Sequence, residues 1–123
     1  MIEAIEKYGS GFYRMTGTDK WQIAYITHSD AYGDLKEFKR HMTTDEVIIP
    51  IQGSASLYTY ENDAISCIEM KKNVIYNIKQ ATWHHIKVSK DALLIVVENS
   101  NITKESTERM TVNGNCSIYK TES

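Results

Sequence analysis

The stretch KRHMTTDEVIIPIQG, residues 39–53, decides how the rest of the chain is interpreted. It places His41 five residues before Glu46, follows the glutamate with the apolar run 47–51, and ends on a turn residue, Gly53. A continuous apolar run is typical of a strand that is buried on both faces or lies at an interface. The segment therefore joins polar groups capable of chemistry to a strand that belongs to a core.

Outward from this stretch, the chain between Trp21 and Val97 alternates short apolar segments with turn residues. That spacing is typical of an all-β sandwich or barrel. Pro50 has no N–H for a ladder bond, so we expect it at a bulge, a strand end or a sheet edge. Glu61-Asn62-Asp63 predicts a hairpin turn. The predicted strands cover residues 21–25, 35–42, 47–51, 55–60, 65–70, 74–78, 83–88 and 93–97.

Both ends of the chain are less regular. Ile2, Ile5 and Tyr8 have helical spacing, so the first dozen residues predict either a short helix or a strand swapped with another copy. Residues 99–123 are polar, and we expect a short strand near 107–112 followed by a mobile tail.

Length and composition narrow the range of functions. With 123 residues the chain has room for one domain. Its 14 basic and 16 acidic side chains give no electrostatic reason to expect a nucleic acid or a membrane as partner. No apolar run approaches the roughly 20 residues that span a bilayer. We expect a cytoplasmic protein whose two cysteines, Cys67 and Cys116, are reduced.

Alternation along the predicted strands sorts the histidines. Residues two apart share a face, so His84 lies with Ile86 and Val88 and points inward, whereas His85 points outward. The same parity puts Lys39 and His41 on one face. We interpret His28 as an ordinary hydrogen-bonded histidine.

Two motifs in these segments resemble those of the cupin family. The first cupin motif has two histidines one residue apart, then a glutamate, then a glycine after six further residues. His41, Glu46 and Gly53 match it, and Lys39 stands at the first histidine position. The second motif has a proline, a glycine and a histidine, and here only His84 is retained. The proline and glycine positions hold Lys79 and Ala81.

The resemblance implies a single-domain antiparallel β-barrel of jelly-roll type. The whole chain, residues 1–123, would be one cupin-like domain with a barrel core at about 20–99 and a polar extension at 100–123. The site would lie at the mouth of the barrel. Family members commonly pair through sheet edges and terminal strands, so the resemblance also implies a homodimer.

The inferred position of Glu46 would complete a cluster with His41 and His84. Two imidazoles and a carboxylate can hold a divalent transition metal with open positions, and iron, manganese, nickel and zinc are all compatible. The leading hypothesis is a metal-binding cupin that acts on a small polar metabolite. The alternatives are a metal-free module binding a sugar or a carboxylate, and a non-catalytic interaction domain.

Lys39 complicates a simple transfer of the family's metal site. An inward ammonium repels a nearby cation, so Lys39 either pairs with Glu46 and removes a ligand or bends aside. In the second case it would anchor a substrate carboxylate or act as the catalytic acid or base. Both possibilities stay open at the level of sequence.

Overall fold

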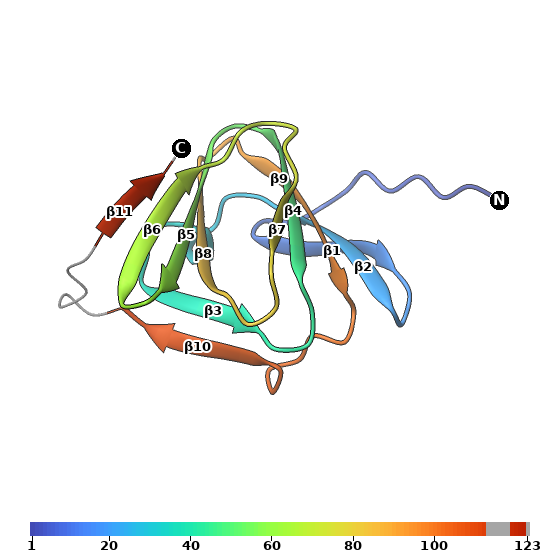
Figure 1. The fold of residues 1–123 in the computed structure, drawn as a ribbon. Helices are drawn as coiled ribbons and strands as arrows, with labels where there is room; N and C mark the ends of the chain where they lie inside the picture. Colours follow the sequence, from blue (N-terminus) through green and yellow to red (C-terminus); the bar gives the residue numbers. More distant parts are fainter. Residues whose placement is uncertain (113–118, 123) are drawn as a thin grey trace.

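The computed structural model describes residues 1–112 and 119–122, and strands dominate them (Figure 1). Among these residues no helix is long and apolar enough to cross a membrane. A single turn of 3-10 helix covers Asp30–Tyr32. The strands are β1 Phe12–Gly17, β2 Trp21–Ile26, β3 Glu37–His41, β4 Glu46–Gln52, β5 Ala55–Glu61, β6 Ala64–Glu69, β7 Tyr76–Ile78, β8 Trp83–Val88, β9 Leu93–Asn99, β10 Thr107–Thr111 and β11 Tyr119–Glu122.

The strands form two sheets that close around a common interior (Figure 1). The first has the order β1-β2-β9-β4-β7 and the second the order β10-β3-β8-β5-β6-β11. Every strand pair is antiparallel except β11 with β6, which run parallel. The predicted all-β barrel of jelly-roll type is therefore confirmed, and the parallel last strand is an addition that the sequence pattern did not show.

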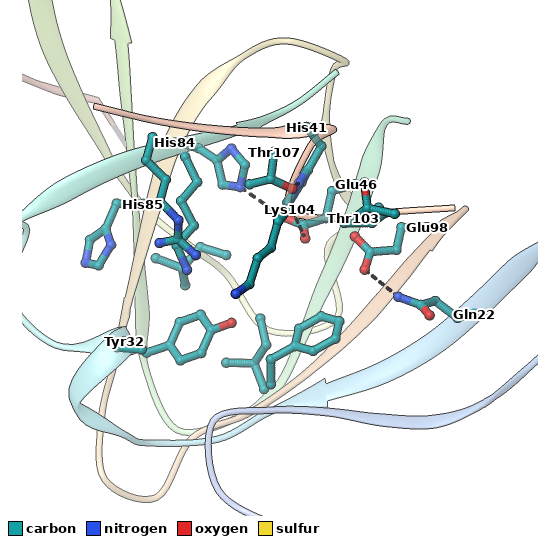
Figure 2. A pocket seen from close by; sticks show the side chains of 17 residues that line it. Gln22, Tyr32, His41, Glu46, His84, His85, Glu98, Thr103, Lys104 and Thr107 are labelled. Atoms are coloured by element: carbon teal, nitrogen blue, oxygen red, sulfur yellow. Dashed lines mark hydrogen bonds and ion pairs between the residues drawn. The ribbon is translucent and has the colours of Figure 1, made fainter. Parts of the chain in front are cut away.

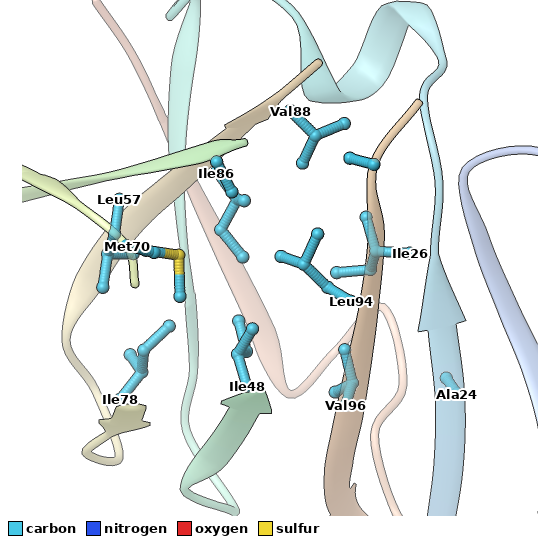
Figure 3. Packing of buried hydrophobic residues seen from close by; sticks show 12 residues of the cluster. Ala24, Ile26, Ile48, Leu57, Met70, Ile78, Ile86, Val88, Leu94 and Val96 are labelled. Carbon is cyan, nitrogen blue, oxygen red and sulfur yellow. The ribbon is translucent and has the colours of Figure 1, made fainter. Parts of the chain in front are cut away.

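The core lies between the two sheets (Figure 3). Ile48, Leu94 and Val96 are fully buried there, because alternate residues of β4 and β9 face inward. Side chains from the second sheet, such as Leu57 and Ile86, pack against them from the other side. This apolar cluster fills one part of the barrel interior and leaves the polar part for the site.

The hairpin between β5 and β6 forms where the sequence predicts it. Asn62 and Asp63 both adopt positive φ angles, of 54° and 61°. Two left-handed residues in a two-residue loop are the requirement of a type I′ turn, and asparagine and aspartate tolerate that conformation. Tyr60 Oη also donates a hydrogen bond to Asp63 Oδ1 at 3.1 Å, which ties the turn to its strand.

Pro50 lies at a bulge, as its missing N–H predicts. The register between β4 and β9 shifts between Pro50 and Gln52. On the other side of β4, the pairing with β7 covers only residues 46–48. The missing N–H of Pro50 therefore faces no paired residue of β7, and β4 remains between β9 and β7 in the sheet.

The ends of the chain differ from expectation. The short helix is wrong, because residues 1–9 form neither helix nor strand and extend away from the barrel (Figure 1). A helix so short needs packing to persist, and Met1 and Ile2 are fully exposed. The swapped strand and the homodimer need a second copy and stay predictions.

The C-terminal region folds back onto the barrel. The predicted strand near 107–112 is confirmed as β10, which pairs with β3. The mobile tail is wrong for residues 119–122, which form β11 beside β6. The rest of that tail, with Cys116, lies outside the described residues, and Cys67 is a buried free thiol.

Gly53 is required at the end of β4, and replacing it should destabilise the fold. Its φ is +74°, and an added Cβ would lie 2.6 Å from the Cα of Ala92 and 2.7 Å from the hydroxyl oxygen of Ser89. Left-handed strain and overpacking each cost about 1 kcal/mol or more. We expect Gly53→Ala to lower the free energy of unfolding by about 2 kcal/mol, measured by urea denaturation.

Gly33→Ala is the matched control for this experiment. Gly33 has a φ of −96°, and its added Cβ would meet only the carbonyl oxygen of Asp30, at 3.5 Å. That distance is an ordinary van der Waals contact. Equal losses of stability for the two variants would contradict the role assigned to Gly53.

Candidate metal centre and its cavity

Three strands bring His41, Glu46 and His84 together at one end of the barrel. His41 ends β3 and Glu46 begins β4, so the short turn between them carries the chain from one sheet to the other. His84 lies on β8, beside β3. His41 and Glu46, five residues apart in sequence, therefore face each other across the interior, as the predicted cluster requires.

The ligand atoms of this cluster converge (Figure 2). Glu46 Oε1 lies 3.1 Å from His84 Nε2, and Glu46 Oε2 lies 3.6 Å from His41 Nε2. One potential ligand atom from each residue falls within 4.8 Å of the other two. Glu46 and His84 are buried, and His41 is partly buried. Such a set of nitrogen and carboxylate donors can surround a single ion.

The outer nitrogen of each imidazole is held by a neighbour. His84 Nδ1 donates to the carbonyl oxygen of Thr82 at 2.9 Å, and His41 Nδ1 lies 3.1 Å from the hydroxyl of Thr107. A carbonyl can only accept, so Nδ1 of His84 carries a hydrogen. In the neutral ring, Nε2 then presents its lone pair toward Glu46. Hydrogen bonds of this kind orient metal-ligating histidines.

Charge within the cluster favours an ionised Glu46. Burial by itself would raise the pKa of Glu46, but the hydrogen bonds and charges of His41 and His84 outweigh it and lower the pKa. Burial likewise opposes protonation of His84, yet the hydrogen bond to Glu46 and its charge raise the His84 pKa. A cation at this point would compete with the proton on His84.

Ala81 adopts a backbone conformation that is typical of glycine. Ala81, at the glycine position, has a φ of 66°, in the left-handed region that favours glycine. Its N–H donates to the carbonyl oxygen of His41 at 2.9 Å. The turn before β8 thus fixes the backbone of β3 next to the site. Lys79, at the proline position, is exposed and forms an ion pair with Asp45.

A cavity of about 960 Å³ opens beside the cluster. Its wall includes the three cluster residues and also residues from the C-terminal extension, among them Ile102, Lys104 and Arg109. The extension folds over this side because β10 pairs with β3. The position of the extension could not be predicted, because the local sequence pattern does not reveal which strand β10 pairs with.

Glu98 is a site residue that the sequence reasoning missed. It lies opposite Glu46 in the β4–β9 ladder, and its Oε2 accepts a hydrogen bond from Gln22 Nε2 at 2.9 Å (Figure 2). Its Oε1 is buried and has no hydrogen-bond partner among the described residues. Burial, followed by the charge of Glu46, raises the pKa of Glu98 to about 8. A shared proton or a cation would satisfy that oxygen.

Glu98 had a signal in the sequence. Leu94, Val96 and Glu98 are two apart, so an inward Leu94 and Val96 place Glu98 on the inward face as well. A charged residue at the inward position of an apolar strand indicates a polar interior site.

Tyr32 had no such signal, since it lies outside the segments predicted as strands. Its hydroxyl points into the cavity (Figure 2). Burial, then the charges of Glu46 and Glu98, raise its pKa, which keeps the hydroxyl protonated. Tyr32 therefore presents a hydrogen-bond donor to the cavity.

Lys39 lies directly across from His84 in the β3–β8 pair and also lines the cavity. Burial, and next the charge of Arg109, lower its pKa. No ion pair joins Lys39 to Glu46 within the described part of the chain. The carboxylate of Glu46 is engaged by the two histidines and stays available as a ligand.

The two other histidines lie apart from the cluster. His85 is the next residue of β8, and its Nε2 lies 2.7 Å from the carbonyl oxygen of Gly33. Contrary to the expected outward position, His85 is among the residues that line the cavity. It is half-buried rather than a surface residue. His28 does not line the cavity.

Known structures resemble this chain in shape at low sequence identity. No protein-family model and no curated protein matches the sequence. One such structure is that of Streptomyces Pac13, which is described as a nucleoside dehydratase. Its structure with uridine superposes with a TM-score of 0.63 at 8% identity, and the match covers 87% of this chain and 84% of Pac13. A cupin-2 domain protein from Shewanella frigidimarina has a TM-score of 0.54 at 17% identity, covering 76% of this chain and 83% of its own.

A third likeness is to the 3,4-ketoisomerase QdtA of Thermoanaerobacterium thermosaccharolyticum, in complex with TDP-4-keto-6-deoxyglucose. Its TM-score is 0.59 at 18% identity, over 70% of this chain and 63% of QdtA. Likeness at this level is evidence about the fold alone.

Proposed function

This chain has the cupin fold, and we propose that it binds a divalent transition metal ion through His41, Glu46 and His84 and takes a small polar metabolite into the adjoining cavity. The observation that carries the proposal is the convergence of two imidazole Nε2 atoms on one buried carboxylate. The Nδ1 atoms of both rings are engaged in hydrogen bonds with Thr107 and Thr82, so the Nε2 atoms are free to face an ion.

The donor set suits iron, manganese, nickel or zinc, because each accepts imidazole together with carboxylate. The unpartnered Oε1 of Glu98, opposite Glu46, is a further sign that this pocket accommodates positive charge. A bound divalent ion with open positions would polarise an oxygen of the ligand.

We propose Lys39 as the residue that assists the reaction. It lies beside His84 on the cavity wall, within the same row of side chains. Burial lowers the pKa of Lys39 and so brings it closer to neutral pH than the pKa of an exposed lysine. Lys39 can therefore both donate a proton and accept it back during a reaction. Alternatively it holds an acid group of the ligand without exchanging protons.

The size of the cavity supports a small-molecule ligand. About 960 Å³ is at the upper end of the range of roughly 300–1,000 Å³ found for sites of small molecules and cofactors. Two proteins of the same fold are recorded with ligands of this kind, uridine in one case and a TDP-linked keto sugar in the other.

Metal analysis tests the proposed centre directly. Protein prepared without chelators and reconstituted separately with Fe²⁺, Mn²⁺, Ni²⁺ and Zn²⁺ should retain about one equivalent of at least one metal after gel filtration, because the three residues form a single site. His84→Ala should retain none, and His28→Ala, which leaves the cavity intact, should bind like the unaltered protein. Background metal in every reconstitution would contradict the proposal.

A metal-free binding module is the second candidate, and Lys39 is the observation that favours it. A lysine at a position where cupins place a metal ligand adds positive charge beside the cluster. Glu46 and His84 can also satisfy each other as an ion pair without any metal. In that case metals would leave the thermal stability unchanged, whereas an ion bound only by the folded state raises it by linkage.

A further inference from the structure

Cations gather on one side of the cavity. Lys39 and Arg109 are direct partners in the β3–β10 ladder, and Lys39 is the direct partner of His84 in the β3–β8 pair. Cross-strand partners project from the same face of a sheet. Arg109, Lys39 and His84 therefore form one row across three strands, and its last member belongs to the proposed metal centre.

A third cation reaches the same space from outside the sheet. Lys104 lies in the turn before β10, and Figure 2 shows its side chain extending into the cavity toward Tyr32. The cationic side of the cavity, by which we mean Lys39, Lys104 and Arg109, thus combines two neighbouring sheet residues with one from the covering segment.

These charges are poorly compensated by the protein itself. Like charges directly opposite each other on a sheet destabilise it. Arg109 forms an ion pair with Glu37, but Lys39 and Lys104 have no ion pair among the described residues. The two acids that line the cavity are engaged elsewhere, Glu46 by the histidines and Glu98 by Gln22. Two of the three cations, Lys39 and Lys104, therefore have no ion-pair partner among the described residues.

We propose that the cationic side binds an acid group, carboxylate or phosphate, of the metabolite that occupies the cavity. The inference rests on the proposed function insofar as it assumes a ligand in this space. Ammonium and guanidinium groups donate charge-assisted hydrogen bonds to the oxygens of both acid types. The Tyr32 hydroxyl and the amide of Gln22 are left for the uncharged part of the ligand.

The proposal sets a charge requirement on the ligand. Its acid end lies toward Arg109 and Lys104, and the row of cross-strand partners leads from there to His84. A positively charged compound would meet three cations and be excluded. An uncharged sugar or nucleoside would leave the cations without a partner and bind more weakly than its phosphorylated or carboxylated counterpart.

Matched pairs of probes test this requirement. Calorimetric titrations of metal-free protein, kept in chelator, would compare glycerol 3-phosphate with glycerol, uridine monophosphate with uridine, and malate with malamide. We expect at least one acid to bind at least about 10-fold more tightly than its uncharged partner, with affinity falling as salt is added. The phosphate and carboxylate pairs show which acid group is preferred. No preference for any acid would overturn the proposal.

Variants locate the effect. Lys104→Gln should weaken binding of the preferred acid about 10-fold, since it removes one charged hydrogen-bond donor. Lys90→Gln removes an exposed lysine that does not line the cavity, and should bind like the unaltered protein. Equal binding by Lys104→Gln and the unaltered protein would overturn the assignment. Because no metal is present, failure of the metal proposal leaves this result intact, and the reverse also holds.

Discussion

Replacing Glu46 with glutamine should lower the affinity for the preferred divalent metal by more than about 100-fold. Loss of an outer hydrogen-bond partner of a metal ligand already costs about 10- to 100-fold in affinity, so loss of the ligand's own charge should cost more. Glu46→Gln keeps the shape of the side chain between His41 and His84. It therefore removes the charge without opening a cavity, and competition with a chelator of known affinity would measure the change.

Glu61→Gln is the matched control for this substitution. Glu61 lies at the exposed end of β5 and does not line the cavity, and its loss should leave metal affinity unchanged. Retention of tight binding by Glu46→Gln would contradict the role of Glu46 as a metal ligand.

The same titrations should depend on pH in a defined direction. The interaction with Glu46 raises the pKa of His84, so its proton must leave before Nε2 can hold an ion. Metal affinity should therefore rise as the pH is increased through the pKa of His84. In Glu46→Gln this dependence should move to lower pH, because the charge that holds the proton on His84 is gone.

The barrel could be predicted because strand periodicity is a local property. Val47–Ile51, Trp83–Val88 and the hairpin at Asn62 were each visible as short segments between turn residues, and the structure places strands there. Parity then placed Lys39 and His41 on one face and His84 inward, which agrees with the cross-strand pairs. Two degenerate motifs completed the predicted cluster.

The rest of the cavity depends on which strands become neighbours, and no local pattern contains that information. Lys104 and Arg109 reach the site only because β10 returns to pair with β3. Tyr32 comes from a single 3-10 turn, which is too short to show a periodic pattern in the sequence. The expected N-terminal helix failed for a related reason, since helical spacing over a few residues needs a surface to pack on. The cavity residues outside the two motifs therefore depend on long-range contacts that the sequence pattern does not show.

Acidic residues line one side of the cavity and basic residues line the other, so each side favours a different part of a ligand. Glu46 and Glu98 form the acidic side, where a cation or a proton is favoured. Lys39, Lys104 and Arg109 form the cationic side, where an acid group is favoured. A metabolite that reaches from one to the other would present its acid end to the lysines and an oxygen to the histidine cluster.

Glu98 should make the metal-free protein less stable as the pH rises. Its pKa is raised to about 8 by burial and by Glu46, well above the ordinary value of about 4.3 in the unfolded chain. Between these two pH values the folded protein holds a proton that the unfolded chain has released. The contribution of Glu98 is therefore fully present below about pH 4 and is lost as the pH rises through about 8.

Glu98→Gln should remove this dependence. Its side-chain oxygen can accept from Gln22 as before, and its NH₂ group can donate to Glu46 without any titratable proton. We expect the variant and the unaltered protein to have similar stability at pH 5 and to differ by about 4 kcal/mol in favour of the variant at pH 9, since about three pH units separate pH 5 from the Glu98 pKa of about 8 and each corresponds to about 1.4 kcal/mol. Urea unfolding in chelator across this range measures the difference.

Comparing the two proteins at each pH cancels the pH-dependent contributions that they share. Glu61→Gln should follow the unaltered protein throughout, because Glu61 is exposed and does not line the cavity. Parallel curves for Glu98→Gln and the unaltered protein would mean that Glu98 is ionised across the whole range. Its buried Oε1 would then need a partner other than a proton shared with Glu46.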